Sequence, residues 1–147
     1  MQKGDFLLNT KSINLIKKYE GLKLTAYKCS AGVWTIGYGT TIYPNGQKVK
    51  QGDKITAKQA EEYLLYYINN NITLPEGLNE SQQAALASLI YNVGQGAFNR
   101  SNLKQAILSM DYQKIIQNWD WVKAAGKPLK GLAKRRAEEL YYFFKDM

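Results

Sequence analysis

The sequence predicts an α+β fold with two lobes, one holding a small antiparallel sheet and one built mainly of helices. Apolar residues recur at helical spacing between residues 10 and 20, and β-branched and aromatic residues broken by turn signals fill residues 24–50. From residue 56 onward the apolar periodicity is helical. We therefore expect a single domain over residues 1–147, with a helix and hairpin lobe (1–55), a long connecting helix (56–71) and a helical lobe (72–147).

The first helix is expected over residues 10–20, with Ile13, Ile16 and Tyr19 on one face. Thr10 or Ser12 is the expected N-cap. Gly21 is the expected stop, because glycine adopts the left-handed conformation that ends many helices. Residues 1–9 before it are interpreted as a docking arm.

The sheet is expected to have two or three strands. Residues 24–27 and 33–39 are the first two, joined by a turn at 30–32. A second turn at Pro44-Asn45-Gly46 precedes residues 47–50, which form the possible third strand.

The helical part begins with a capping-box pattern, Thr56 with Gln59, that opens a helix running to Asn71. A second such pattern opens a helix at Asn79, and Gly94 closes it before a loop over residues 95–99. Further helices are expected after Ser101 and Asp111, and a last one follows Pro128 and Gly131.

Amino-acid composition limits the partners and the kinds of catalytic or metal site that this chain can have. The net charge of +8 and pI near 9.5 favour an anionic partner such as a wall polymer, a lipid surface or nucleic acid. The absence of histidine excludes histidine-based catalysis and the usual histidine metal sites, and a single cysteine excludes an internal disulfide. We expect no metal and no cofactor. We also find no pattern typical of a secretory leader or a membrane span.

Glu20 is the leading candidate for catalysis. It is the only acidic residue between Asp5 and Asp53, in an interval that contains seven lysines. At the C-terminal end of a helix the macrodipole disfavours a carboxylate, which is the direction of pKa shift that a general acid needs. The alternative is an ordinary surface ion pair with a nearby lysine.

Three blocks carry a family resemblance. Glu20, Cys29 and Thr35 stand in an E-x8-C-x5-T spacing within residues 19–41, and residues 81–101 and 126–140 supply the other two blocks. In this order the blocks closely resemble the phage-type lysozymes, the endolysins of glycoside hydrolase family 24. The resemblance implies a lysozyme-like fold and hydrolysis of the β-1,4 bond between N-acetylmuramic acid and N-acetylglucosamine in bacterial peptidoglycan.

The resemblance also implies roles for these residues. Glu20 matches the general acid, and Thr35 matches the hydroxyl that helps hold the attacking water. Members usually have Asp at the second position, whereas this chain has Cys29. We hypothesise that Cys29, as a thiolate favoured by the neighbouring Lys28, replaces that aspartate. A small buried hydrophobe and a covalent nucleophile are the alternatives, and the inverting or retaining course stays open.

Substrate contacts are expected from residues in all three blocks. Tyr38 and Gly39 lie on the hairpin segment, where an aromatic ring suits a sugar but also suits ordinary packing. Tyr91 and Asn92 close a helix. Arg135 and Arg136 are candidates to reach Glu20 or the acidic peptide stems, with a solvated helix face as the alternative.

Two other functions compete with the muramidase. One is a catalytically idle cationic protein that binds peptidoglycan or disrupts membranes. Nucleic-acid binding rests on the pI and scattered aromatics and lacks a recognition motif, so we expect no nucleic-acid partner. A lytic transglycosylase would share the single acid. We expect a monomer that is attracted to membranes only by charge, held in the host cytoplasm until a membrane lesion lets it reach the cell wall.

Overall fold

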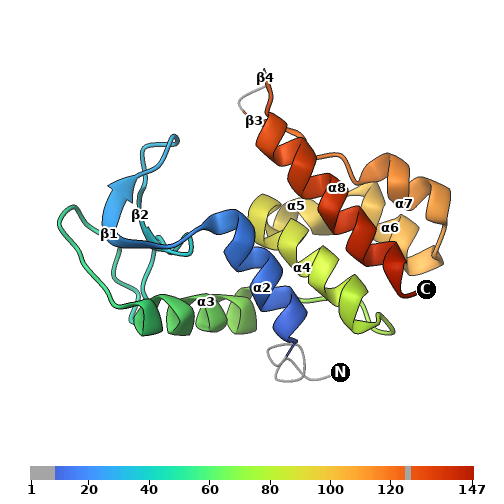
Figure 1. Ribbon diagram of the computed structural model, residues 1–147. Coiled ribbons are helices and arrows are strands. Elements are labelled where there is room, and N and C mark those ends of the chain that lie inside the picture. The colour runs from blue at the N-terminus through green and yellow to red at the C-terminus, as the bar shows by residue number, and fades with distance from the viewer. Residues whose placement is uncertain (1–8, 125–126) are drawn as a thin grey trace. The chain divides into compact units, whose positions relative to one another are not determined.

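The computed structural model describes residues 9–124 and 127–147 (Figure 1). The chain forms two compact units, one of Ile16–Asn71 and the other of residues up to Leu15 together with Ile72–Met147. The predicted α+β class is confirmed, since helices and a two-stranded antiparallel sheet make up the described parts. Nearly all of the predicted docking arm, residues 1–8, lies outside the described residues. No helix in the described ranges is long and apolar enough to cross a membrane.

Helix α2 (Thr10–Glu20) carries Leu15 and Ile16 fully buried on one face. Neither of the predicted caps is used. The Asn9 side chain instead accepts a hydrogen bond from the Ser12 backbone N–H at 3.3 Å, which is the standard N-cap contact made one residue earlier in the sequence. The predicted stop is confirmed, because Gly21 has φ 70° and its N–H donates to the Lys17 carbonyl at 3.0 Å.

Strands β1 (Lys23–Lys28) and β2 (Trp34–Gly37) form the antiparallel hairpin. Tyr27 lies directly opposite Thr35, and the register shifts between Lys23 and Tyr27. Residues 47–50 do not form a third strand and contribute only an isolated bridge between Ile42 and Lys48. The segment that extends the sheet beyond β1 is 53–55, which sequence periodicity did not single out.

Two backbone contacts attach that segment to β1. The Ala26 N–H donates to the Asp53 carbonyl, and the Ile55 N–H donates to the Leu24 carbonyl, each at 2.9 Å. Helix α3 (Ala57–Asn71) follows, opened by the predicted capping box between Thr56 and Gln59. Its buried residues are Ala60, Leu64 and Ile68, and the helix packs against β2.

The second unit is built around α4 (Glu80–Val93), of which every residue from Ser81 to Ile90 is buried. The predicted capping box at Asn79 and Gln82 and the predicted closure at Gly94 are both confirmed. Figure 1 shows α8 (Lys130–Lys145) lying along α4, and this pair makes the most extensive helix contact in the molecule's described parts. Buried aromatic residues such as Phe98, Trp119 and Phe143 fill the surrounding core.

The remaining elements are short. Helices α6 (Asn102–Ser109) and α7 (Tyr112–Asn118) begin after the predicted caps Ser101 and Asp111. Residues 95–99 were expected to be a loop, but α5 (Gln95–Asn99) is a single helical turn that buries Phe98. A two-residue hairpin, β3 (Lys123–Ala124) with β4 (Lys127–Pro128), precedes α8 and was not expected.

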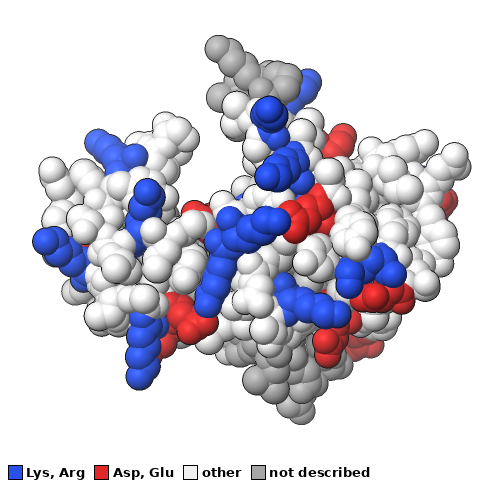
Figure 2. Space-filling model, viewed as in Figure 1, with Lys and Arg blue, Asp and Glu red and all other residues white. Residues whose placement is uncertain are grey.

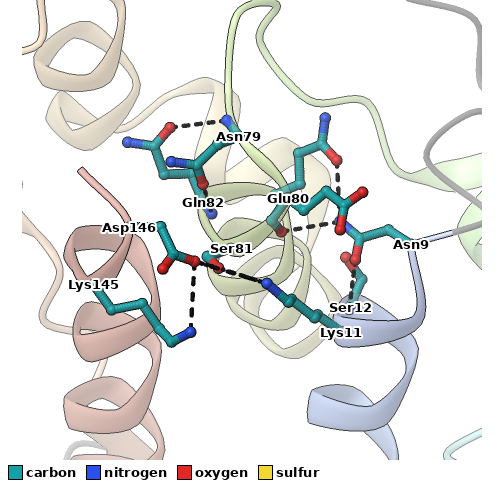
Figure 3. Close-up of polar contacts among 10 residues, drawn as sticks. Asn9, Lys11, Ser12, Asn79, Glu80, Ser81, Gln82, Lys145 and Asp146 are labelled. Atoms are coloured by element: carbon teal, nitrogen blue, oxygen red, sulfur yellow. Dashed lines mark hydrogen bonds and ion pairs between the residues drawn. The ribbon is translucent and has the colours of Figure 1, made fainter.

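A polar cluster joins the start of α2 to the start of α4 and the end of α8 (Figure 3). The Asn9 amide donates to the Glu80 carbonyl and to the Gln83 side chain, both at 3.0 Å. The Ser81 hydroxyl donates to the Asp146 carboxylate, and Lys11 approaches the same carboxylate at 3.7 Å. These contacts hold the first residues of α2 in the unit formed by Ile72–Met147.

Candidate active site

Glu20 is the last residue of α2 and is half-buried. The left-handed Gly21 ends the helix immediately after it, so the carboxylate stands where the helix gives way to β1. Two lysines occupy the same last turn of the helix. One of them, Lys17, pairs with Glu61 of α3 and places its ammonium 5.4 Å from the centroid of the Tyr38 ring.

Cys29 lies just after β1, in the turn that leads to β2. Its N–H donates to the Val33 carbonyl at 3.0 Å, and its carbonyl accepts from the Gly32 N–H at 2.8 Å. The backbone N–H groups of Val33 and then Ala31 lower the pKa of the thiol, against an opposing effect of burial, with a smaller contribution from the Thr35 hydroxyl. A turn that aims N–H groups at sulfur stabilises its thiolate form.

The structure gives no support to the hypothesis that Lys28 supplies this stabilisation. The Lys28 ammonium lies 5.9 Å from the centroid of the Trp34 ring, and it is not among the groups that lower the pKa of Cys29. In a strand, adjacent side chains point to opposite faces, which explains why a neighbour in sequence is not the partner here.

Thr35 is buried on β2, and its hydroxyl donates to the Val33 carbonyl at 2.9 Å. The same hydroxyl contributes to lowering the pKa of Cys29. The two residues that the sequence spacing selected on the hairpin are therefore brought together by the turn between β1 and β2.

Tyr27 belongs beside these groups, although sequence reasoning missed it. It is opposite Thr35 across the sheet and two residues before Cys29, and both relations place side chains on one face. Burial and then the negative charges of Glu20 and Cys29 raise the pKa of its phenol. The strand alternation of Tyr27 with Cys29 is the signal that would have found it.

The other predicted hairpin residues, Tyr38 and Gly39, follow β2 directly. Tyr38 is half-buried beneath the Lys17 ammonium. Gly39 has φ 98°, a conformation that suits glycine, inside the tight turn closed by the paired backbone bonds of Ile36 and Thr40. Both residues belong to the same unit as Glu20, Cys29 and Thr35.

Tyr91, Asn92, Arg135 and Arg136 belong to the other unit. Tyr91 is half-buried and Asn92 is exposed in the last turn of α4. The two arginines do not lie on a solvated helix face, since Arg135 is only 4% exposed and Arg136 only 2% exposed. Single-sequence periodicity missed this because long side chains can be buried when carboxylates accompany them.

The carboxylate that accompanies the arginines is Glu139, which is fully buried. Arg136 approaches it with Nε at 2.7 Å and Arg135 with Nε at 3.3 Å. The Ser88 hydroxyl donates to Glu139 at 2.5 Å and the Trp119 indole N–H donates at 3.1 Å. This cluster joins α8 to α4 and to the end of α7 within one core.

Comparisons with known proteins agree over most of the chain. The profile of the phage lysozyme family matches residues 17–139. The endolysin of Acyrthosiphon pisum secondary endosymbiont phage 1 is 38% identical, covering 92% of this chain and 97% of that protein. The endolysin of Salmonella phage P22 is 34% identical, covering 92% of this chain and 97% of that protein.

Solved structures give the same result. An endolysin from Escherichia coli O157:H7 phage FAHEc1 superposes with a TM-score of 0.77 at 35% identity, covering 94% of this chain and 93% of that chain. The muramidase domain of SpmX from Asticaccaulis excentricus superposes with a TM-score of 0.73 at 28% identity, covering 92% of this chain and 95% of that one.

Proposed function

This chain belongs to the phage lysozyme family, and from that membership we propose that it cleaves the β-1,4 bond between N-acetylmuramic acid and N-acetylglucosamine. It is an endolysin that hydrolyses bacterial peptidoglycan. The observation that supports a working site is the hairpin turn that stabilises a thiolate at Cys29, on the face that Tyr27 shares with it and with Thr35.

In the proposed mechanism Glu20 is the general acid. Its carboxyl proton passes to the glycosidic oxygen. As the bond from that oxygen to the muramic acid C1 breaks, the oxygen becomes a hydroxyl group of the departing N-acetylglucosamine. A general acid starts the reaction neutral and finishes it as a carboxylate, and Glu20 has this role in the proposal.

Cys29 is proposed to act on the opposite side of the sugar. Its thiolate accepts the proton of the attacking water as the water oxygen bonds to C1, and its charge offsets the oxocarbenium-like charge that develops there. Thr35 lies beside the sulfur and is proposed to help position that water. Tyr38, Gly39, Tyr91 and Asn92 remain proposed substrate contacts. Arg135 and Arg136, which were also candidates, are buried around Glu139 and are not proposed to contact substrate.

The test compares wild type with Glu20→Gln by turbidity loss of permeabilised bacteria. We expect the variant to be slower by about 10²–10⁴-fold, because general acid catalysis contributes that much. Glu62→Gln is the matched control, since Glu62 is an exposed carboxylate of the same unit. Equal clearing by wild type and Glu20→Gln would contradict the enzymatic function and favour a non-catalytic cationic protein.

The sugar ends released from purified peptidoglycan identify the reaction. A new reducing muramic acid end is the product of hydrolysis, as proposed. An anhydro-muramic end would instead indicate a lytic transglycosylase, in which the sugar's own hydroxyl replaces water.

The remaining proposals concern the oligomeric state of the protein and the place where it acts. We propose that it acts as a monomer on the cell wall, after a membrane lesion releases it from the host cytoplasm. Lys and Arg side chains are spread over the visible face of the molecule (Figure 2), consistent with the net charge of +8. Such a surface favours approach to anionic wall and membrane surfaces through electrostatic attraction alone.

A further inference from the structure

A surface groove with a volume of about 470 Å³ lies in the unit of Ile16–Asn71, apart from the residues given catalytic roles. Neither Glu20 nor Cys29 nor Thr35 lines it. We call it the Tyr43 groove and define it by six of its lining residues, namely Tyr43, Lys48, Lys50, Asp53, Lys54 and Tyr63.

One wall of the Tyr43 groove is held in place by hydrogen bonds. The Tyr43 hydroxyl donates to the Asp53 carboxylate at 2.7 Å, and the Lys50 backbone N–H donates to the same carboxylate oxygen at 2.9 Å. The N–H of Lys50 and then the Tyr43 hydroxyl lower the pKa of Asp53, so its charge is fixed and satisfied within the wall. The Tyr43 and Tyr63 rings lie 5.4 Å apart at 60°.

The charge around this wall is positive. The side chains of Lys48, Lys50 and Lys54 are exposed at the groove, and the only carboxylate among the residues that line it is Asp53. Asp53 accepts two hydrogen bonds from the wall and interacts electrostatically with Lys50, so Lys48 and Lys54 are the lysines placed to receive an incoming anion. Two tyrosine rings beside three ammonium groups suit a ligand that is both anionic and partly apolar.

We propose that the Tyr43 groove binds the acidic peptide stem of uncut peptidoglycan. The lysines receive the stem's carboxylates, and the tyrosine rings pack against its methyl-bearing and methylene portions. The identity of the ligand rests on the proposed function, whereas the groove itself does not. A simple phosphodiester polymer would use the lysines but would leave the aromatic wall without a role.

The segment 53–55, which lines part of the Tyr43 groove, is hydrogen-bonded to β1, the strand that leads to Cys29. Through their backbones Asp53 and Ile55 bond to Ala26 and Leu24 of β1. A stem bound in the groove is therefore held by the same small sheet that carries the proposed catalytic turn, which restrains the attached glycan strand near that sheet.

The test follows backbone amide signals by NMR while a disaccharide tetrapeptide, N-acetylglucosaminyl-N-acetylmuramyl-tetrapeptide, is added. We expect shifts at residues 43–54 and a loss of affinity of about tenfold in Lys48→Gln/Lys54→Gln. The control is Lys114→Gln/Lys134→Gln, which removes equal charge from two exposed lysines of the other unit and should retain the wild-type affinity.

Three outcomes would overturn the assignment. One is an absence of shifts at residues 43–54, and another is equal loss of affinity in both double variants, which would indicate only general charge attraction. The third is a response to poly(glycerol phosphate) but not to the tetrapeptide. Failure of the proposed function is separate, because it appears as equal clearing by wild type and Glu20→Gln whatever the groove binds.

Discussion

Cys29 owes its lowered thiol pKa to backbone geometry, a property that substitution of neighbouring side chains would leave in place. The turn at residues 30–33 aims the N–H groups of Val33 and Ala31 at the sulfur. An aspartate at the same position would find the same donors, which would hold its carboxylate ionised. The two residue types are thus physically exchangeable at this turn as acceptors of a water proton.

This exchange predicts a pH-dependent result. Because the pKa of the Cys29 thiol is lowered, the thiolate forms as pH rises through that lowered value, so activity should rise with pH over that range. Cys29→Asp should keep activity and move this rise down to the range of a carboxyl group, about pH 4 or below. Cys29→Ala should lose most activity at every pH. The measurement is the pH profile of turbidity loss for the three proteins.

A fully active Cys29→Ala protein would remove the catalytic role and leave the cysteine as a packing residue. Circular dichroism spectra of the three proteins provide the control for folding.

At the residue scale, the turn between β1 and β2 brings Cys29 and Thr35 together, although they are six positions apart in the sequence. Their catalytic roles, with that of Glu20, stay predictions. Tyr27 was missed because its place depends on the cross-strand register, which the irregularity between Lys23 and Tyr27 sets. Register is a property of two strands together, so a single run of residues does not reveal it.

At the scale of elements, helix ends depend on polar side chains from distant segments. Asn9 caps α2 and also donates to Glu80 and Gln83 of α4, so one amide orders two helix starts. Ser81 connects α4 to Asp146 at the end of α8. Sequence patterns identified α4 and its caps, since capping boxes are local, but they placed the cap of α2 too late because Asn9 is fixed by its distant partners.

The contact between Ser81 and Asp146 predicts a pH effect on stability. The Ser81 hydroxyl, followed by Lys145 and Lys11, lowers the pKa of Asp146 in the folded protein. A depressed carboxyl pKa contributes stability above the unfolded value, and that contribution is lost as pH falls through the folded value. Asp146→Asn should therefore show a smaller drop in urea midpoint between pH 6 and pH 3 than wild type.

Glu62→Gln provides the comparison for this experiment, because it removes an exposed carboxylate that belongs to the other unit. An identical pH dependence in wild type and Asp146→Asn would show that the contact does not contribute to stability in solution.

The shortest helix and the shortest strands were not predicted from this sequence. The five residues of α5 are too few to display helical periodicity, and the two-residue strands β3 and β4 are too short to display alternation. Their conformations follow from the core around them. The third strand expected at residues 47–50 is reduced to one isolated bridge between Ile42 and Lys48.

For the whole molecule, the main feature of α8 is a cluster of buried charges. Glu139 stands between two buried arginines and accepts from Ser88 and Trp119. The pattern of α8 predicted a helix with an apolar face, and this face instead includes an ion cluster. The sequence gives no sign of such pairing, because burial of a charge depends on which other helices surround it.

Removal of the Glu139 charge should therefore be costly. Glu139→Gln removes the buried carboxylate charge that Arg135 and Arg136 share, and we expect a loss of about 3–5 kcal/mol in the free energy of unfolding. Urea denaturation followed by tryptophan fluorescence measures it. Glu62→Gln, at an exposed position, should change the free energy by about 0.5 kcal/mol or less. Similar small losses in both variants would mean that the cluster adds little beyond its packing.

The path of the chain through its two units has a consequence for synthesis on the ribosome. Residues 16–71 are contiguous and have their partners at hand soon after translation, whereas Asn9 meets Gln83 across 74 positions and Ser81 meets Asp146 across 65. Residues 9–15 are synthesised early, but they cannot make their contacts with residues 80–146 until those residues have been translated. Moving residues 9–15 to the other end of the gene, as a circular permutant, would make the second unit contiguous and remove that wait.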